Sequence, residues 1–365
     1  MNEISQLLRQ EIATNGAISF ARFMEIALYC PKIGYYERDP ALIGLAGQFY
    51  TSPSLGPLFG QLLATQFAFW SLERRFDELR WVEGGAHDGR MALAILEWLG
   101  KNRPALLERL TYVIVEPSAT RRGWQEQKLA EFAGRVKWVE SLAELKRPGV
   151  NGVIFSNELI DSFPIRRICW DRSRLQWHER GVALRDNDFA WVRLQRSNVE
   201  IQAELKRAGI FISPELLTVL PDGFTIDLCP GATDWWKGAA EALTGGKLVT
   251  IDYGYTGEEL LAPERSQGTA RAYFGQRVSD DLLANPGEQD LTAHINFTQL
   301  QRVGEAAGLK TEMLVEQERF LSLIFQRDLE YGNTERWSAA ELRQFHSLTH
   351  PEHLGKRFRV LVQSR

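Results

Sequence analysis

The sequence predicts an α/β protein built on a doubly wound, mostly parallel sheet. From residue 79 onward, short apolar segments rich in valine and isoleucine alternate with segments whose apolar residues recur every three or four positions. Apolar strands separated by helices are typical of a parallel sheet covered by helices on both faces. Seven strands are expected, at 79–84, 111–116, 136–140, 152–156, 247–252, 309–316 and 357–363.

Helical periodicity fills the stretches between and before these strands. Helices are expected at 89–99, 119–133, 141–147 and 232–243. Two more are expected within 3–29, where Gly16 and Ser19 interrupt the apolar repeat and the Ser19 hydroxyl suits a helix N-cap. Residues 31–60 are rich in Gly, Pro and Tyr and predict a long loop, of a length typical of lids and binding loops.

Composition narrows the class of protein. The 365 residues are 44% hydrophobic and 25% charged with a net charge of −4, and no long run of Lys or Arg suggests nucleic-acid binding. Three distant cysteines without a CxxC pair argue against a disulfide framework and fit a reducing compartment. No apolar stretch is long enough to span a membrane, and the first residues lack a targeting pattern, so we expect a cytoplasmic protein.

The first strand ends in a loop suited to a nucleotide-like ligand. Open α/β sheets bind ligands at the carboxyl ends of their strands, and small residues there allow a close backbone approach. The loop consists of Glu83, Gly84, Gly85, Ala86, His87, Asp88 and Gly89, and the next strand ends at Glu116, whose carboxylate can accept ribose hydroxyls. NAD binding is disfavoured because the G-x-G-x-x-G order is absent. The acidic residue that opens the loop instead suits a cationic sulfonium such as that of S-adenosylmethionine.

Two further groups of residues carry chemistry. Asn157, Glu158 and Asp161 follow the fourth strand and could bind a cationic acceptor or take its proton, or could cap a short helix. Glu288, Asp290 and His294 place three titratable groups within seven residues, although Asp290 and His294 also have the spacing of a helix-surface pair.

A third pattern is a histidine repeat near the end of the chain. His346, His350 and His353 have a spacing that could suggest a metal, but Pro351 interrupts the helix that would align them. We therefore expect no metal site.

Together these motifs resemble the MidA family of methyltransferases, whose mitochondrial members are protein-arginine methyltransferases. The resemblance covers nearly the whole chain. It includes Gly34-Tyr35-Tyr36, Thr51-Ser52-Pro53, the Glu83 loop, Glu116-Pro117-Ser118, Asn157-Glu158-Leu159, Asp252-Tyr253-Gly254 and Pro286-Gly287-Glu288-Gln289-Asp290. It implies a seven-stranded class I methyltransferase (Rossmann-like) sheet with N-terminal helices and a β-rich insertion, and S-adenosylmethionine as the cofactor. It also implies a protein arginine as the acceptor, and it leaves a homodimer open.

The resemblance also implies roles for the candidate residues. Cofactor binding is expected of Glu83, Gly85, Ala86, His87, Asp88, Gly89, Glu116, Ser118, Tyr36 and Ser52, and catalysis of Asn157, Glu158, Asp161, Glu288, Asp290 and His294. Segment 286–297 is expected to close the active site opposite Asn157–Asp161. Three positions depart from the family pattern: His87 replaces a glycine, Gln48 an aspartate and Ser54 a glutamate. A small-molecule methyltransferase and a non-catalytic assembly factor remain alternatives.

The sequence patterns predict that the chain divides into four segments. N-terminal helices and a lid loop are expected over 1–78, the cofactor-binding half of the α/β domain over 79–164, and a β-rich insertion over 165–228. The remainder of the α/β domain follows over 229–365 and contains an active-site insertion at 253–296.

Overall fold

The computed structural model describes residues 2–38, 52–74, 76, 78–275, 277–330 and 337–365. They group into two compact units, which we describe separately. The sheet unit comprises Phe49–Leu159, Trp235–Tyr253 and Val303–Arg365, and the insertion unit comprises Met1–Gln48, Ile160–Asp234 and Gly254–Arg302. The insertion unit thus combines the N-terminal helices with the first expected insertion and nearly all of the second, whereas the four-segment division remains a prediction.

The sheet unit is built on seven strands in the order β15-β16-β10-β5-β2-β3-β4. Their bounds are β2 Leu79–Gly84, β3 Leu110–Val115, β4 Val136–Val139, β5 Val150–Asn157, β10 Leu243–Tyr255, β15 Lys310–Glu316 and β16 Phe358–Ser364. Strands β4, β3, β2, β5 and β10 are parallel to one another, and β16 runs antiparallel to both β10 and β15. The strand order reverses beside β2, so the ends of β2 and β5 lie at the switch point where such sheets bind ligands.

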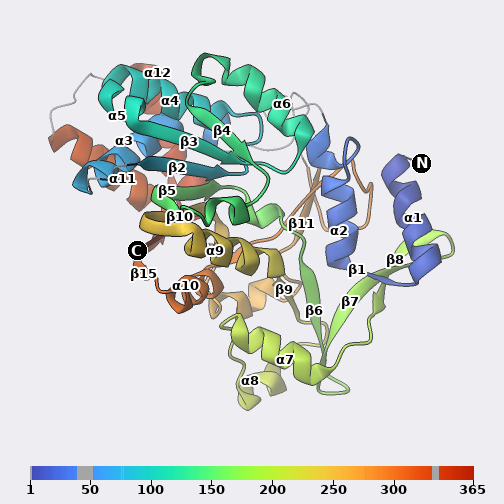
Figure 1. Ribbon diagram of the computed structural model, residues 1–365. Coiled ribbons are helices and arrows are strands. Elements are labelled where there is room, and N and C mark those ends of the chain that lie inside the picture. The colour runs from blue at the N-terminus through green and yellow to red at the C-terminus, as the bar shows by residue number, and fades with distance from the viewer. Residues whose placement is uncertain (1, 39–51, 75, 77, 276, 331–336) are drawn as a thin grey trace. The chain divides into compact units, whose positions relative to one another are not determined.

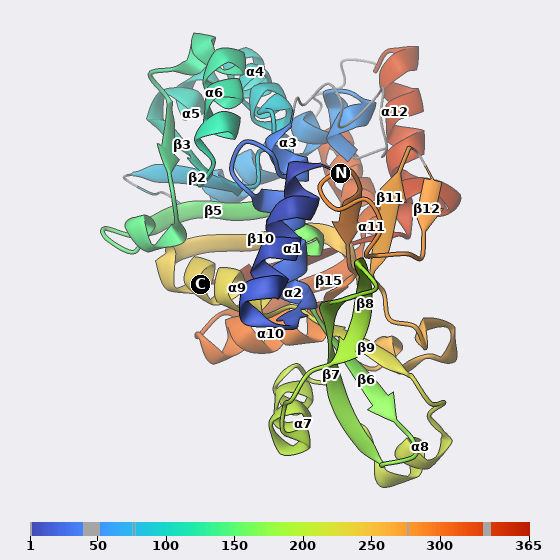
Figure 2. The same cartoon turned by 90° about the vertical axis from the view of Figure 1, so that its right-hand side faces the viewer.

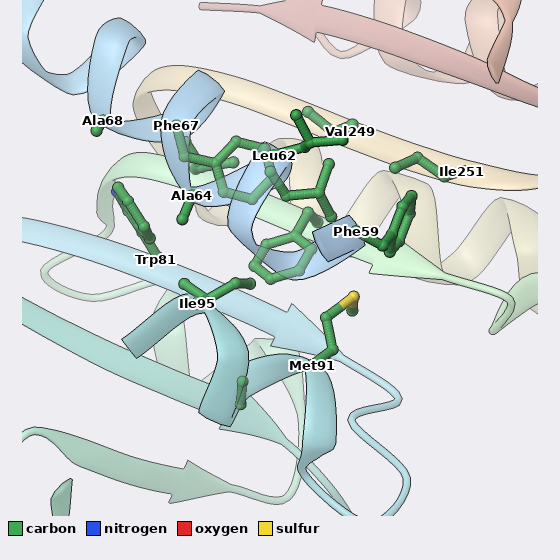
Figure 3. Packing of buried hydrophobic residues seen from close by; sticks show 14 of the residues in the cluster. Phe59, Leu62, Ala64, Phe67, Ala68, Trp81, Met91, Ile95, Val249 and Ile251 are labelled. Atoms are coloured by element: carbon green, nitrogen blue, oxygen red, sulfur yellow. The ribbon is translucent and has the colours of Figure 1, made fainter. Parts of the chain in front are cut away.

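Helices cover both faces of this sheet (Figure 1). The helices of the unit are α3 Leu58–Glu73, α4 Arg90–Asn102, α5 Pro104–Arg109, α6 Ala119–Lys128, α11 Gln317–Glu330 and α12 Ala339–Thr349, with most of α9 Pro230–Ala242. Figure 3 shows Phe59, Leu62 and Phe67 of α3 packed among residues of β2, β10 and α4. On the other face, the buried Trp236 of α9 donates its indole N–H to Gln363 of β16 over 2.8 Å.

The insertion unit is mainly antiparallel. Its larger sheet has the order β1-β7-β6-β9 with β8 paired to β7, and β12-β11-β13 form a smaller sheet. The strands are β1 Ile18–Ser19, β6 Arg166–Asp171, β7 Gln176–Arg185, β8 Asp188–Arg193, β9 Thr225–Leu228, β11 Arg271–Phe274, β12 Arg277–Ser279, β13 Asp290–Thr292 and β14 Ile295–Asn296. Its helices are α1 Glu3–Asn15, α2 Phe20–Tyr29, α7 Asn198–Arg207, α8 Pro214–Val219 and the first part of α10 Phe297–Ala306. Figure 2 shows the long β6–β7 ladder with α7 beside β7.

The expected elements agree with the structure except at a few places. All seven strands are present, and Ser19 caps α2 by accepting from the Arg22 N–H at 3.1 Å. Helix 119–133 ends early, at Lys128, and 141–147 contains only a short 3-10 helix at Leu142–Leu145. Helix α3 was not expected, because its apolar residues surround the whole helix and give no amphipathic repeat. Among the described helices, none is both long and apolar enough to cross a bilayer.

One close backbone approach yields a prediction about stability. Gly246 of β10 pairs with Gly152 of β5 and has φ +121°, and an added Cβ would overlap the Gly152 carbonyl oxygen. Gly246→Ala should therefore lower the free energy of unfolding by about 2–4 kcal/mol, from strain and overpacking. Gly134→Ala is the control, because nothing lies within 4 Å of that position. Urea denaturation of both variants measures the difference, and equal midpoints would contradict the prediction.

Candidate active site

Glu83, near the end of β2, is a buried carboxylate with one oxygen left for a ligand. Its side chain is fully buried, and Tyr112 of β3 donates its hydroxyl to Oε2 over 2.5 Å. Among the described residues, Oε1 has no hydrogen-bond partner. Burial raises the pKa of Glu83 to about 7, the nearby Asp88 adds to the rise, and the Tyr112 hydrogen bond opposes it. A buried carboxylate with a raised pKa and an unpaired oxygen is suited to a cationic or N–H-donating ligand.

The loop after β2 packs so closely against neighbouring side chains that two of its positions have room only for glycine. An added Cβ at Gly84 would overlap the ring of Trp235, and one at Gly85 would lie 2.7 Å from Leu159 Cδ1. Gly85 and Gly89 have φ of +72° and +83°, which glycine adopts without strain. His87 also has a positive φ, +48°, so the residue that replaces the family glycine keeps a glycine-like conformation.

Asp88 closes this loop onto α4. Its Oδ1 accepts from the backbone N–H of Arg90 at 3.0 Å, and Lys128 lies 3.1 Å from Oδ2. Burial would raise the pKa of Asp88, but its bonds to His87 and Arg90 outweigh burial and hold the pKa well below its usual range. The carboxylate is thus engaged within the protein, an arrangement that favours a positioning role over direct contact with a cofactor.

Glu116, directly after β3, is only 2% exposed and is held on several sides. Its Oε1 accepts from the Ser118 N–H at 2.9 Å and from Arg121 at 2.8 Å, and its Oε2 accepts from Gln125 Nε2 at 3.3 Å. Ser118 itself caps α6, since its hydroxyl accepts from the Arg121 N–H at 3.2 Å. The carboxylate is therefore fixed in orientation at the end of a strand next to the Glu83 loop.

The end of β5 carries a second strained turn. Glu158 has φ +48°, its N–H donates to the Ile251 carbonyl at 3.0 Å, and its Oε1 accepts from the Ser52 N–H at 3.0 Å. Asn157 donates from Nδ2 to the same oxygen at 3.0 Å, while its buried Oδ1 has no partner within the described part of the chain. Positive φ at a non-glycine residue costs energy and is common at functional sites.

In the insertion unit, tyrosines and aspartates far apart in sequence gather into one cluster. Tyr36 donates its hydroxyl to Asp290 Oδ1 over 2.6 Å, its ring lies 5.4 Å from that of Tyr29, and Tyr273 pairs with Asp290 across β11 and β13. The Asp161 carbonyl accepts from the Ala293 N–H at 2.8 Å. We call Tyr29, Tyr36, Tyr273, Asp161 and Asp290 the tyrosine–aspartate cluster.

The two aspartates of this cluster affect the pKa values of two of its tyrosines. Burial raises the pKa of Tyr36 well above its usual value, and Asp290 and Asp161 both add to the rise. Burial and the same two aspartates also raise the pKa of Tyr273. Tyr36 and Tyr273 therefore stay protonated as donors, and the two carboxylates that act on both, Asp161 and Asp290, are only 7% and 8% exposed. Sequence reasoning did not single out Tyr29 and Tyr273, because their pairing partners are remote in the chain.

Two residues expected to be catalytic, Glu288 and His294, make contacts outside the tyrosine–aspartate cluster. Glu288 Oε1 accepts from Asn2 Nδ2 at 3.0 Å and so fastens the start of α1 to the 286–288 turn. His294 packs edge-on against Tyr255 with ring centroids 4.9 Å apart, and burial followed by Arg271 and Arg265 lowers its pKa to about 4. Ser54 is buried in the sheet unit, whereas Gln48 lies outside the described residues.

The histidine repeat does gather on the surface. The ring centroids of His346 and His350 are 4.8 Å apart, and those of His350 and His353 are 5.0 Å apart. Within the described residues, no group of three or more His, Cys, Asp or Glu residues has an arrangement that could hold a metal ion.

The fold and the strand-end residues define the class of protein. A 3-2-1-4-5-7-6 sheet, written in order of appearance of its strands, is the class I methyltransferase arrangement. Glu83 Oε1, which has no hydrogen-bond partner among the described residues, fits S-adenosylmethionine, which offers an amino group and a positive sulfonium. The chain is an S-adenosylmethionine-dependent methyltransferase by fold and site.

Comparison with known proteins identifies the family. Residues 61–315 match the Methyltransf_28 family, described as "Putative S-adenosyl-L-methionine-dependent methyltransferase", and the chain belongs to this family. A protein from Burkholderia thailandensis bound to S-adenosyl-homocysteine has 29% sequence identity and a TM-score of 0.84, over 99% of this chain and 92% of that one. A native crystal structure of a COG1565 superfamily protein from B. thailandensis has 30% sequence identity and a TM-score of 0.82, over 99% of this chain and 91% of that one.

Curated relatives correct one expectation. "Protein arginine methyltransferase NDUFAF7, mitochondrial" of Mus musculus is 25% identical over 88% of this chain and 74% of its own length. The homologue of Caenorhabditis elegans is 24% identical over 81% and 70%. Both are named mitochondrial, so the expected cytoplasmic location is wrong. The expectation rested on the lack of a recognisable targeting pattern, and such a negative observation does not define a compartment.

The raised pKa of Glu83 predicts a pH effect on stability. Because the folded pKa of about 7 exceeds the ordinary glutamate pKa of 4.5, the folded state holds this proton more tightly than the unfolded state does. The carboxylate therefore lowers the free energy of unfolding progressively as pH rises from about 4.5 through 7. Without cofactor, Glu83→Gln should be more stable than wild type at pH 8 by about 1–3 kcal/mol, and should lose this advantage at pH 5.

Denaturation of wild type and Glu83→Gln at both pH values checks this expectation. The exposed Glu131 supplies the control variant Glu131→Gln. A stability difference between Glu83→Gln and wild type that stays the same from pH 5 to 8 would contradict the assignment.

His87 allows a test of the loop. Because its φ of +48° favours glycine, His87→Gly should bind S-adenosyl-homocysteine as tightly as wild type or slightly more tightly. His87→Ala keeps the Cβ and removes only the ring, so it separates backbone strain from a ring contact. Titration calorimetry measures both affinities. A loss of tenfold or more in both variants, with the fold intact, would show that the imidazole contacts the cofactor.

Proposed function

We propose that this chain transfers the methyl group of S-adenosylmethionine to an arginine side chain of another protein. The observation that carries the proposal is the tyrosine–aspartate cluster, in which Tyr36 holds Asp290 over 2.6 Å beside Asp161. Two relatives that align with most of the chain are named protein arginine methyltransferases, which supports the same acceptor.

The cluster has the chemistry that recognises a guanidinium group. Arginine is planar, remains charged and presents its N–H groups in a fork that matches a carboxylate, and it also stacks on aromatic rings. Asp161 and Asp290 supply buried carboxylates, whose negative charge would attract a guanidinium group. The rings of Tyr29 and Tyr36 supply aromatic surface next to those carboxylates.

The strand ends of the sheet unit are assigned to the cofactor. Glu83 offers Oε1, Gly85 and Ala86 offer backbone, and Glu116 offers a fixed carboxylate for ribose hydroxyls. S-Adenosylmethionine supplies the methyl group when it is bound. Ser52 and Asn157 orient Glu158, whose carboxylate would favour positive charge on the acceptor. Holding two reactants in one orientation is itself a source of rate.

Several expected residues receive structural roles in this proposal. Asp88 anchors the loop to α4, and Glu288 anchors the start of α1. His294, with its lowered pKa, is neutral near pH 7 and packs on Tyr255. Asp161 and Asp290 of the insertion unit therefore remain as the proposed acceptor-facing carboxylates, and Glu158 of the sheet unit remains a proposed catalytic residue.

The acceptor is tested by product analysis. The purified protein is incubated with methyl-labelled S-adenosylmethionine and a protein extract from cells that lack it, and the labelled proteins are hydrolysed to amino acids. We expect the label in methylarginine. Label in lysine or another residue, or only in small molecules, would contradict the proposal.

Asp290→Asn tests the cluster. The variant keeps the shape and can still accept the Tyr36 hydrogen bond, but it loses the charge that would pair with the guanidinium. Methylation of the arginine acceptor should fall about 10–100-fold in kcat/KM, the scale of a lost charged hydrogen bond. Affinity for S-adenosyl-homocysteine should stay within about twofold of wild type, because Asp290 is assigned to the acceptor and not to the cofactor. The exposed Asp280 gives the control Asp280→Asn, and equal methylation by both variants would remove Asp290 from the acceptor site.

A further inference from the structure

The fully buried Gln125 of α6 contacts both the loop after β2 and the Glu116 carboxylate after β3. Its Nε2 donates to the His87 carbonyl at 2.9 Å and to Glu116 Oε2 at 3.3 Å. Its Oε1 accepts the indole N–H of Trp138 at 2.9 Å. One side chain therefore joins the loop after β2, the carboxylate after β3 and a residue of β4.

Trp138 fixes which way this amide faces. An indole N–H can only donate, so it must meet the amide oxygen of Gln125. The amide nitrogen then points to His87 and Glu116, and each of its two N–H groups has an acceptor. If the amide flipped, its nitrogen would face the Trp138 N–H, and its oxygen would face the His87 carbonyl and the Glu116 carboxylate. Several buried polar groups would then lose their partners, which costs more than a single hydrogen bond.

The helix that carries Gln125 also packs directly on the loop. An added Cβ at Gly89 would lie 3.5 Å from Gln125 Cα and 3.6 Å from its Cγ. On the other side of the carboxylate, Arg121 and the Ser118 N–H hold Glu116 Oε1. Glu116 is thus clamped at both oxygens, and only the Gln125 clamp also reaches the strained His87.

We infer that Gln125 is a positioning residue for the cofactor, which orients the Glu116 carboxylate and the His87 peptide group together. Gln125 acts through these two groups and need not touch the cofactor itself. The inference rests on the assignment of Glu116 to the ribose, and it is independent of the identity of the acceptor. The Gln125 hydrogen bond to the His87 carbonyl also helps to hold a histidine in a backbone conformation that favours glycine.

The test is titration of S-adenosyl-homocysteine into purified variants. Gln125→Met keeps the length of the side chain and removes its hydrogen bonds, and should weaken binding about tenfold or more. Gln125→Glu keeps the acceptor for Trp138 but places a second carboxylate against Glu116, and should weaken binding at least as much. It serves as the second variant if Gln125→Met folds poorly.

Gln363 supplies a matched control. It is also fully buried, it accepts the Trp236 indole N–H at 2.8 Å, and it donates to Thr311 at 2.8 Å. It lies on β16, which is separated from β2 by β10 and β5 in the sheet. Gln363→Met should lower thermal stability and leave affinity for S-adenosyl-homocysteine within about twofold. An equal loss of affinity in this control would overturn the inference, because general loosening of the core would then explain both.

A double-mutant cycle with Glu116→Ala separates positioning from packing. If Gln125 acts through Glu116, the loss caused by Gln125→Met should be clearly smaller in the Glu116→Ala background than in wild type. The full loss in both backgrounds, or unchanged affinity of a folded Gln125→Met, would overturn the inference. A wild-type protein that fails to bind S-adenosyl-homocysteine would contradict the cofactor assignment itself, and a failure to methylate arginine would leave these affinities unaffected.

Discussion

The buried carboxylate of Glu83 is the constraint on which this end of the sheet depends. A charge without water is costly, and one hydrogen bond from Tyr112 does not satisfy both of its oxygens. The structure keeps the side chain beside the point where the strand order reverses, and a glycine-rich loop follows it. We expect such an arrangement to lower the stability of the unliganded protein at neutral pH and to favour a ligand that brings a proton donor or a positive charge.

The rest of the sheet unit holds this constraint in place. Five parallel strands align their carboxyl ends, so the residues that follow β2, β3 and β5 lie along one edge. The close Gly152–Gly246 pairing joins β5 to β10, and the apolar helix α3 packs on this sheet. Strain is concentrated at His87 and Glu158, and each has a backbone bond or a neighbouring amide that holds it.

Sequence reasoning anticipated the sheet unit better than the insertion unit, for a physical reason. Parallel strands bury both faces and therefore appear as apolar runs, and their ends fall at predictable places, so the positions of Glu83 and Glu116 followed from the pattern. The Tyr36–Asp290 contact joins residues 254 positions apart and depends on tertiary folding alone. The sequence likewise could not show that Glu288 meets Asn2, or that the half-buried His294 packs on Tyr255 near two arginines. The sequence did not predict a role for Gln125, because a glutamine in a helix is ordinarily a surface residue.

The most direct measurement of the central claim is the number of protons exchanged when S-adenosyl-homocysteine binds at pH 7. Calorimetry in buffers of different ionisation enthalpy gives this number for wild type and for Glu83→Gln. With a pKa of about 7, Glu83 is about half protonated before binding, and a ligand that favours the carboxylate should make wild type release about half a proton more than the variant. Equal proton exchange and equal affinity in the two proteins would contradict the account.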